Sequence, residues 1–588
     1  MKKVLIIVLS VLLFLSPLFS QNLQKIHPIN SEVYEIITYL YIESGLALPS
    51  TSGPYSTDEL LKMLDKIDRS SFSGYPLKLY DEVESILHKE AKPFKFSFEA
   101  ALEAYLHIDK ENFTTEQRWV TGYDQRKPLF KVQLDTALAK YFYGYSEIGL
   151  GITRYQGFDD NIGGTSVMFG KDIIGSNFFL FNNGFDVGDV DFSIPNRAFA
   201  AFGGKNWSAQ IGRDKLSWGP GVSGNFMLSD HLKYHNLGRF TAYSNNFKYT
   251  LVSSFFPHPK DYYDSSGAKP QQWQGGDPLS GLNMFLAHRL EWRMFKDKVG
   301  FALSEAIMYQ SDDNTLDLRI LNPSMIYHNY YIRSNANSLL SFELNYTPIK
   351  RLNIYGQLAI DEFALVGEPV PGKDEGAFPS AFAYMLGVKG DYPLKKGLLY
   401  GSFEFALTDP YLYLRYGTDT DHNLGESGIS YVVAMREYFS GGYIFYDEQF
   451  VGYPYGPDAI VLNANVGYKE INKWNIEGNI FLMFHGTHDQ WTLWTEVYPD
   501  EVADDNHLPY LSTPTEEHLT GNNWDDNADL RDAISKTLAI SVKGGYTFID
   551  SLDVYGQLDF INIINPGNRK LNSSIRDLQF TLGASYRF

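Results

Sequence analysis

The segment from Gly212 to Asp230 carries the residue types that best suit a binding site. Arg213 and Asp214 offer a cation and a carboxylate, and Trp218 opens a run of glycine and proline. Glycine frees the backbone and proline fixes φ, so this run predicts a tight turn that holds the indole. A fixed aromatic ring can stack on a sugar face while charged groups bind its hydroxyls. We therefore predict a ligand site here, with a constriction or plug contact as the alternative. Its residues are Arg213, Asp214, Trp218, Gly219, Pro220 and Gly221.

Other patterns for catalysis or metal binding are weaker. Residues 219–224 fit G-x-G-x-x-G, but strand-like sequence on both sides does not supply the helix that a dinucleotide site requires. His485 and His488 could offer two imidazoles to a metal, although surface histidines are the simpler interpretation. Residues 525–529 imitate the start of a calcium loop without its glycine and final glutamate. No G-x-S-x-G motif is present. We expect no metal, no cofactor and no catalytic residues.

The composition bounds the class of protein. The 588 residues include 41 Tyr, 41 Phe and 9 Trp but no Cys, and the net charge is −20. The lack of Cys excludes disulfides, thiolate metal sites and Cys nucleophiles. An acidic chain disfavours nucleic acid as a partner, because phosphate binding needs a basic face. The mean hydropathy of −0.25 is too polar for a bundle of membrane helices, which leaves the many aromatic residues to be explained.

The N-terminal sequence predicts export. Lys2 and Lys3 precede an apolar run from Val4 to Leu15, and Ser20 is a small residue suited to cleavage. The apolar run is shorter than the ~20 residues that a membrane-spanning helix needs. We therefore interpret residues 1–20 as a signal peptide rather than a retained anchor.

A small helical unit is expected over residues 21–92. Residues 31–44 repeat apolar side chains at helical spacing, and Gly45 ends the pattern. Ser56-Thr57-Asp58-Glu59 is a capping box before a second helix, and a third helical pattern ends before Pro93. This unit is too short to form a large core alone, so we expect it to pack on the rest of the chain.

From residue 93 the hydrophobic period changes from 3.6 to 2. Apolar and polar residues alternate from Phe94 to Leu106, from Ile476 to Phe484 and from Asp577 to Phe588. Long strands with aromatic ends suit an outer-membrane barrel, whose apolar face meets lipid and whose polar face lines the lumen. The final Phe588 resembles the signal that such barrels present to their assembly machinery. We predict that residues 93–588 form a mainly β, transmembrane barrel of about 18 antiparallel strands, rather than a secreted sandwich or propeller.

Long polar segments predict long outer loops. Nine acidic residues lie between Tyr498 and Arg531, and residues 257–281, 367–379 and 408–428 are also polar. In outer-membrane barrels the long loops lie outside the cell and the short turns face the periplasm. Such loops are either solvated surface or segments that fold inward and narrow the lumen.

One fragment occurs twice. Tyr355-Gly356-Gln357 and Tyr555-Gly556-Gln557 match in phase within residues 352–361 and 552–561. The alternation places each Tyr and Gln on the lumen side. We interpret the two fragments as similar strand solutions rather than as a duplicated functional site.

Several segments, in order, resemble the Wzi family of capsule-assembly proteins. They are Gly212-Arg213, Trp218-Gly219-Pro220-Gly221 with Leu228-Ser229, Leu321-Asn322-Pro323, Asn337-Ser338-Leu339-Leu340, Tyr355-Gly356-Gln357 with Asp361-Glu362-Phe363, and Tyr453-Pro454-Tyr455-Gly456-Pro457-Asp458. The resemblance implies an outer-membrane barrel with a periplasmic helical bundle. It also implies a surface lectin that holds exported capsular polysaccharide on the cell and is not an enzyme. The expected partners are surface polysaccharide, outer-membrane lipid and the barrel-assembly machinery, which would bind the strand ending in Phe588.

Two other functions stay open at this point. A general porin with acidic lumen rings would favour cations. An outer-membrane enzyme would need partners for His485 and His488 across the lumen mouth. The net charge of −20 would repel an anionic polymer unless Arg213 and Lys215 cluster locally or divalent cations bridge the charges. We therefore hypothesise a glycan of modest charge.

Overall fold

The structure is a computed structural model. It describes residues 21–109, 112–113, 120–121, 126–150, 179–181, 197–259, 273–274, 281–311, 314–324, 326–327, 336–363, 381–414, 429–438, 443–488, 531–570 and 572–588. The predicted signal peptide, the calcium-like residues 525–529 and almost all of the acidic loop 498–531 lie outside these ranges. Within the described ranges, no helix is long and apolar enough to cross a membrane.

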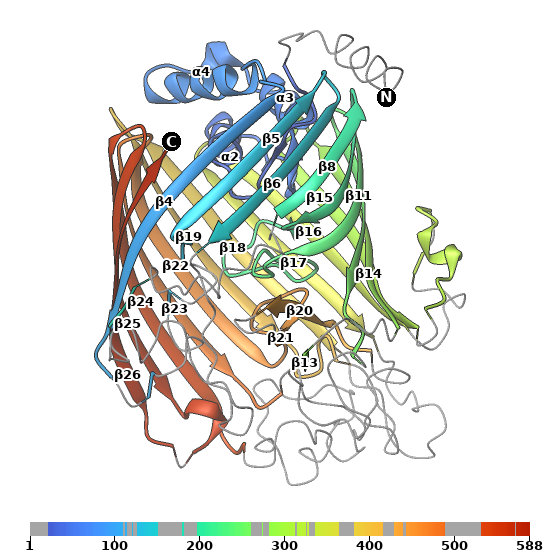
Figure 1. The fold of residues 1–588 in the computed structure, drawn as a ribbon, viewed down its shortest axis with the longest axis vertical. Coiled ribbons are helices and arrows are strands. Elements are labelled where there is room, and N and C mark those ends of the chain that lie inside the picture. Colours follow the sequence, from blue (N-terminus) through green and yellow to red (C-terminus); the bar gives the residue numbers. More distant parts are fainter. Residues whose placement is uncertain are drawn as a thin grey trace, which may run out of the picture.

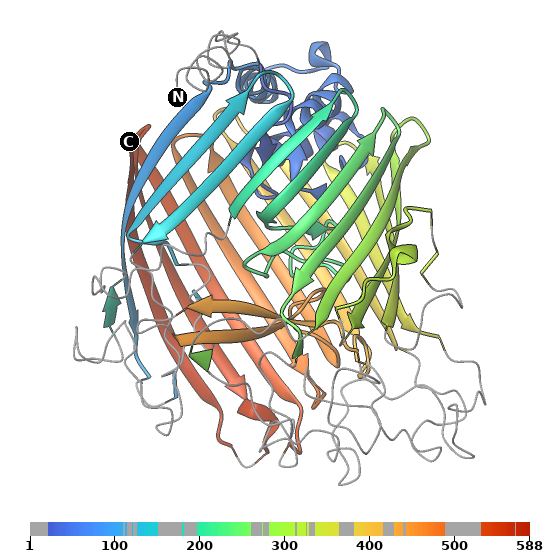
Figure 2. The same cartoon turned by 45° about the vertical axis from the view of Figure 1, so that its right-hand side comes forward.

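Eighteen antiparallel strands form a closed barrel, which confirms the predicted fold class and strand number. The strand ends that long sequence intervals separate lie at one end of the barrel, here called the loop end, and those joined by short turns lie at the other, the turn end (Figures 1 and 2). The strand β26 pairs with β4 to close the sheet, and the three-residue β7 (Phe179–Phe181) also pairs with β4. The strands are β4 (Phe94–His107), β5 (Phe130–Leu138), β6 (Phe142–Leu150), β8 (Arg197–Gly204), β9 (Trp207–Asp214), β11 (His235–Tyr243), β12 (Phe247–Phe256), β14 (Leu282–Met294), β15 (Val299–Ser311), β16 (Ala336–Ile349), β17 (Leu352–Glu362), β18 (Ala381–Pro393), β19 (Leu398–Thr408), β22 (Ala459–Glu470), β23 (Trp474–His485), β24 (Ser535–Ile549), β25 (Leu552–Ile564) and β26 (Ile575–Arg587).

The two faces of the wall follow the predicted alternation. In β26, Leu578, Phe580 and Leu582 are 41%, 37% and 49% exposed on the outside of the barrel. The intervening Gln579 and Thr581 are only 2% and 5% exposed, because they face the filled lumen. An exposed apolar outer face with a polar inner face is the pattern of a barrel surrounded by lipid.

The predicted helices lie across the turn end of the barrel (Figure 1). Ser31 and Ser56 cap α2 and α3 by accepting hydrogen bonds from backbone N–H groups, which confirms Ser56 as the N-cap of the predicted capping box. The Glu59 side chain of that box binds Lys248 instead of returning to the cap. Gly45 ends α2 with a φ of 77°, a conformation that glycine adopts readily. The helices are α2 (Glu32–Ser44), α3 (Thr57–Asp65) and α4 (Tyr75–Leu87), with the short 3-10 helix η1 (Arg69–Ser71) between the last two and η10 (Pro566–Asn568) after β25.

The helical unit packs on the barrel, as its size predicts. Arg351 in the β16–β17 turn forms two hydrogen bonds of 2.9 and 3.0 Å to Glu43 of α2. Lys66 after α3 lies 2.6 Å from Asp297 in the β14–β15 turn. Two strand pairs complete the unit, and one of them reaches a segment inside the lumen. These pairs are β1 (Ile26–His27) with β3 (Tyr55–Ser56), and β2 (Ser52–Gly53) with β10 (Ser217–Trp218).

An apolar plug fills one side of the lumen. It comprises the described parts of residues 215–234 and 409–458, including β20 (Val432–Tyr438) and β21 (Tyr443–Phe450), which pair with β13 (Trp273–Gln274). Its buried side chains pack against wall residues from β11 to β22. Many of these wall residues are alanines, whose small side chains leave room for the plug. They include Ala287, Ala306, Ala359, Ala383 and Ala406.

Candidate functional site

The predicted stacking residue Trp218 lies inside this plug. Its side chain is 1% exposed, and its backbone N–H donates to the carbonyl of Leu228 at 3.0 Å. Trp218 also pairs with Ser52 through the β10–β2 ladder. The Trp218 indole is therefore not accessible to a ligand, and Trp218 instead forms the plug contact that was the alternative prediction.

The two predicted charged residues point to opposite sides of β9. Arg213 lies on one face of β9, with its guanidinium 3.8 Å from the centre of the buried Tyr234 ring, and it donates to Asn236 at 2.9 Å. Asp214 faces inward and is buried, and it accepts a hydrogen bond of 2.6 Å from Arg197. The structure does not bring Arg213, Asp214 and Trp218 together on one surface, because consecutive strand residues alternate between faces.

The turn after Trp218 is held by three wall residues. The buried Glu404 of β19 accepts hydrogen bonds from the backbone N–H groups of Val222 at 2.8 Å and Ser223 at 2.9 Å. Tyr355 of β17 donates to the same carboxylate at 2.6 Å. Lys389 of β18 lies 5.0 Å from the Tyr355 ring centre and donates to the carbonyl of Pro220 in the turn. Tyr355, Lys389 and Glu404 therefore form a triad that clamps the predicted Gly219-Pro220-Gly221 site from the wall.

Three of the segments that carry the family resemblance, residues 218–229, 355–363 and 453–458, meet around this clamp. Leu321-Asn322-Pro323 lies instead on the outside of the wall, where Tyr249 donates to the Pro323 carbonyl. Gln357 donates to Asn225 at 2.6 Å, next to the glycine turn. Tyr453 lies with its hydroxyl 2.9 Å from that of Ser223, and its ring is 5.3 Å from Phe226. The pairs Gln357–Asn225 and Ser223–Tyr453 join motifs that are about 130 and 230 residues apart in the sequence. These motifs thus form one packed unit.

A second triad with the same chemistry lies on the wall of β25 and β4, with its lysine in the segment just before β5. Tyr555 donates to Glu103 at 2.5 Å, and the Lys127 ammonium lies 4.5 Å from the Tyr555 ring centre. The Lys127 side chain is 39% exposed, and Glu99 and Lys131 beside it are 18% and 31% exposed. None of these side chains belongs to the apolar core of the plug.

The second triad can do what the sequence assigned to the Trp218 turn. Glu103 is only 3% exposed and already accepts hydrogen bonds from Tyr105, Tyr555 and the Lys127 backbone N–H. The groups at this wall that can meet a ligand are therefore the half-buried Tyr555 ring and the Lys127 ammonium group. Sequence reasoning did not select Glu103 or Lys127. The signal that could have found them is the repeat itself, because Tyr555 is the counterpart of Tyr355 and was placed correctly on the lumen side.

The histidine pair is structural. His488 is buried, and its Nδ1 lies 3.2 Å from the carboxylate of Asp458. The ring nitrogens of His485 lie 2.7 and 3.1 Å from the carbonyls of Gly486 and Tyr455. The interpretation as surface histidines is therefore wrong for His488. Among the described residues, no group of three or more His, Asp or Glu side chains could hold a metal ion.

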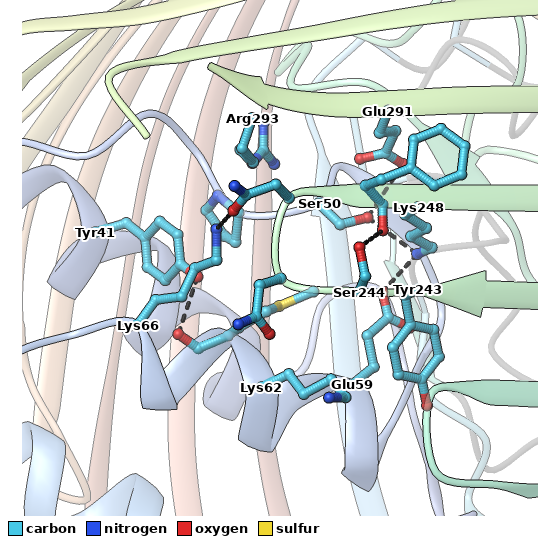
Figure 3. Close-up of a pocket in the computed structure, with 15 residues that line it drawn as sticks. Tyr41, Ser50, Glu59, Lys62, Lys66, Tyr243, Ser244, Lys248, Glu291 and Arg293 are labelled. Carbon is cyan, nitrogen blue, oxygen red and sulfur yellow. Dashed lines mark hydrogen bonds and ion pairs between the residues drawn. The ribbon is translucent and has the colours of Figure 1, made fainter. Parts of the chain in front are cut away.

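A polar pocket marks the seam between the helical unit and the barrel (Figure 3). On one side, Lys248 lies 2.6 Å from Glu59 and donates to Ser50 at 2.9 Å. On the other side, Lys66 and Arg293 lie near Tyr41 (Figure 3). The ion pairs across this seam hold the helices in the mouth of the barrel.

His27 in the short β1 and Asp409 after β19 lie outside the barrel wall and have strongly shifted pKa values. Burial lowers the pKa of His27 in the helical unit to about 3, so this imidazole is neutral at pH 7. Burial also raises the pKa of Asp409, just after β19, to about 7, and the nearby carboxylate of Asp458 raises it further, while a hydrogen bond from the Phe382 N–H opposes the shift. Asp409 is thus a proton-binding group at the loop end of the plug.

The fold and the filled lumen define the class of an outer-membrane-type β-barrel. The chain is similar to Wzi of Escherichia coli, an outer-membrane protein involved in group 1 capsule assembly and described as a carbohydrate-binding β-barrel, with a TM-score of 0.53 at 12% identity over 96% of this chain and 99% of that one. It is less similar to the channel DcaP of Acinetobacter baumannii, with a TM-score of 0.34 at 8% identity over 84% and 97% of the two chains. OccK2 of Pseudomonas aeruginosa, solved with glucuronate, gives 0.35 at 10% identity over 84% and 96%.

No family model matches the sequence, and no curated protein matches it. The likeness to Wzi shows the barrel fold.

Proposed function

We propose that this chain is an outer-membrane barrel of the Wzi type, which binds exported surface polysaccharide as a lectin and is not an enzyme. In this proposal the helices face the periplasm, the long loops face outward, and the strand ending in Phe588 is read by the barrel-assembly machinery. The fold likeness to a carbohydrate-binding barrel supports the proposal. So does the meeting of three of the family-like segments at the plug.

The observation that carries the proposal is the lumen wall opposite the plug. There Tyr555, Glu103 and Lys127 combine an aromatic ring, a carboxylate and an ammonium group within 4.5 Å. Hydroxyl-rich polymers bind to such combinations because the ring takes the apolar sugar face and charged groups take the hydroxyls.

The local charges suit a glycan of modest charge. Lys127 lies 3.6 Å and Lys131 3.8 Å from the carboxylate of Glu99. The two cations are thus balanced by Glu99 and Glu103, so the site does not attract a densely anionic polymer, although the net charge of the chain is −20.

Two measurements on the purified barrel test this function. In a planar bilayer we expect no steady, large conductance, because the plug fills part of the lumen. In a pull-down with the surface polysaccharide of the producing cells, we expect retention of the barrel. A large open pore without retention would contradict the lectin proposal.

A cation-preferring channel is the second candidate. Several acidic side chains face the lumen on strands of the same wall, among them Glu477, Asp553 and Asp559. Rings of carboxylates select cations in pores. The bilayer experiment separates the two functions, because only the channel predicts cation-selective current.

A further inference from the structure

The polar pocket between the helical unit and the barrel, here called the seam pocket, holds more cations than carboxylates (Figure 3). It lies between α3, the turn from β11 to β12, and the end of β14. The charged side chains that line it are Lys62, Lys66, Lys248, Arg293, Glu59 and Glu291. Four cations thus meet two carboxylates, although the chain as a whole carries a net charge of −20.

Both carboxylates of the seam pocket are already paired. Glu59 lies 2.6 Å from Lys248. Glu291 lies 3.1 Å from Arg289, which does not line the pocket. Neither carboxylate is therefore left to pair with the other cations of the pocket. These cations are Lys62, Lys66 and Arg293.

Two of these cations have no partner in the part of the chain that the structure describes. There, neither the Lys62 ammonium group nor the Arg293 guanidinium group forms an ion pair or a hydrogen bond. Lys66 differs from them, because it lies 2.6 Å from Asp297 and donates to Asn246 at 3.0 Å. Lys62 and Arg293 are half-buried in the lining of the pocket, so both are placed to bind an anionic ligand.

The wall fixes the position of the Arg293 guanidinium group. Arg293 is the cross-strand partner of Gly300 on β15, and a Cβ at Gly300 would overlap Nη1 of Arg293. Because Gly300 has no side chain, the guanidinium can lie along the inner wall at the edge of the pocket. A guanidinium group binds a phosphate or a carboxylate through two parallel hydrogen bonds, and one that is already held in place loses little freedom on binding.

Lys66 adds a repulsion that an anion would relieve. Burial lowers the pKa of Lys66, and the nearby charge of Arg293 lowers it further, while Asp297 opposes the shift. Lys66 and Arg293 come from opposite sides of the seam, one just after α3 and the other at the end of β14. An anion bound between them would attract both cations and so offset their mutual repulsion.

We propose that the seam pocket binds a phosphate group, with Arg293 and Lys62 as its direct contacts and Lys66 completing the site. A phosphate monoester carries a charge of about −1.5 to −2 at pH 7, which matches the two unpaired cations. Cations on both sides of the seam also suit the several oxygens of a tetrahedral phosphate better than a single planar carboxylate. The site lies at the turn end of the barrel, and it does not depend on glycan binding in the lumen.

Two sources can supply this phosphate. Phe247 also lines the pocket, and its ring centre lies 5.6 Å from that of Trp292, which lies 5.8 Å from Phe301. Aromatic groups of this kind mark the interface between lipid and water, where lipid headgroups lie. The phosphate therefore belongs either to a lipid headgroup or to a solute at the barrel mouth, and the pocket recognises the chemistry that both share.

Calorimetric titration of the purified, detergent-solubilised barrel at constant ionic strength tests the site with two probes, inorganic phosphate and dihexanoylphosphatidic acid. Arg293→Gln should weaken binding about tenfold or more, because it removes a charge-assisted contact. Lys62→Gln should do the same from the surface of α3, which keeps the test valid if Arg293→Gln disturbs the wall. Lys298→Gln is the matched control, because Lys298 is exposed in the β14–β15 turn and does not line the pocket. It should bind both probes like the unmodified barrel.

The two probes distinguish the sources of the phosphate. Tighter binding of the phosphatidic acid than of inorganic phosphate, lost in both pocket variants, assigns the site to a lipid headgroup. Equal binding of the two probes, lost in the same variants, assigns it to a solute. Two results would overturn the proposal: no binding of either probe by the unmodified barrel, or a loss in Lys298→Gln as large as in the pocket variants. Neither probe is a glycan, so failure here would leave the lectin proposal untouched.

Discussion

The two Tyr-Gly-Gln fragments lie in similar wall positions but have different neighbours. Tyr355 packs over Gly387, donates to Glu404 and lies beside Lys389. Tyr555 packs over Gly583, donates to Glu103 and lies beside Lys127. In each fragment the tyrosine ring thus packs on a glycine of the next strand, and a carboxylate and an ammonium group lie beside the ring.

The difference lies in what each triad holds. The Tyr355 triad is buried and binds the backbone of the plug turn through Glu404. The Tyr555 triad lies on the wall outside the plug core, with Lys127 39% exposed. Glu103, like Glu404, is buried and accepts a hydrogen bond from the backbone, here the Lys127 N–H at 2.7 Å. The two walls therefore differ in the exposure of the ring and the ammonium group, which are more accessible at Tyr555 and Lys127.

Removing the carboxylate should separate the two triads most strongly. Glu404→Ala leaves the backbone N–H groups of Val222 and Ser223 and the buried Tyr355 hydroxyl without their acceptor, which should lower the free energy of unfolding by about 2–3 kcal/mol. The turn would also be released, so bilayer conductance should rise. Denaturant unfolding and conductance check this, with Glu103→Ala as the control that leaves conductance unchanged. Equal conductance in the two variants would contradict the claim that only Glu404 holds the plug turn in place.

A pH dependence should report on the loop end of the plug. Folded Asp409 has a pKa of about 7, whereas an unfolded aspartate titrates near ~3.9. Between these values the folded chain holds a proton that the unfolded chain has lost, so stability should fall as the pH rises from ~4 to ~7 and level off above. Unfolding free energies at pH 4.5 and 8 check this. Asp409→Asn should make the unfolding free energy less dependent on pH in this range. An unchanged pH dependence in that variant would show that another group causes it.

The two glycines under the tyrosine rings should differ in how well they tolerate a larger side chain. A Cβ at Gly387 would overlap the Tyr355 ring, and one at Gly583 would overlap the Tyr555 ring. Gly387→Ala should cost about 1–3 kcal/mol, because the plug leaves Tyr355 nowhere to move. Gly583→Ala should cost less, since the half-buried Tyr555 can rotate. Denaturant unfolding of both variants measures the two losses in the free energy of unfolding. A larger loss for Gly583→Ala would show that Tyr555, rather than Tyr355, is the more tightly packed ring.

The smallest expected effect is loss of one hydroxyl. Tyr355→Phe and Tyr555→Phe each remove a single hydrogen bond to a carboxylate and should lower stability by about 1–2 kcal/mol. The buried Tyr355 should give the larger value, because no water replaces its hydroxyl at Glu404. The denaturant midpoints of the two variants give the stability that each has lost. Equal losses of stability would mean that the two hydrogen bonds do not differ in burial.

Local sequence patterns were enough to predict the barrel. They could not predict which side chains of distant strands would meet. The period-2 alternation placed β4, β23 and β26 and their outward faces, because alternation is a property of each strand alone. The capping box at Ser56 placed α3 for the same reason. The triads escaped prediction because Tyr355, Lys389 and Glu404 lie on three strands, whose register no single strand encodes.

The candidate site shows the same limit. The turn after Trp218 was singled out correctly as unusual, but its exposure depended on Glu404 and Tyr453, both over 180 residues away. His488 likewise gained its buried partner Asp458 from a segment 30 residues earlier. The residue types indicated sugar-binding chemistry, whereas the place where that chemistry is accessible followed only from the fold.

The central claim is that the Tyr555 wall binds polysaccharide while the Tyr355 wall holds the plug. The most direct measurement is the affinity of the purified barrel for the polysaccharide of the producing cells, compared between Tyr555→Ala and Tyr546→Ala. Tyr546 lies on the neighbouring β24 and faces outward, 44% exposed, so its loss leaves the lumen unchanged. The account predicts at least tenfold weaker binding for Tyr555→Ala and wild-type affinity for Tyr546→Ala, an effect of about 1.4 kcal/mol. Wild-type affinity in Tyr555→Ala would contradict it.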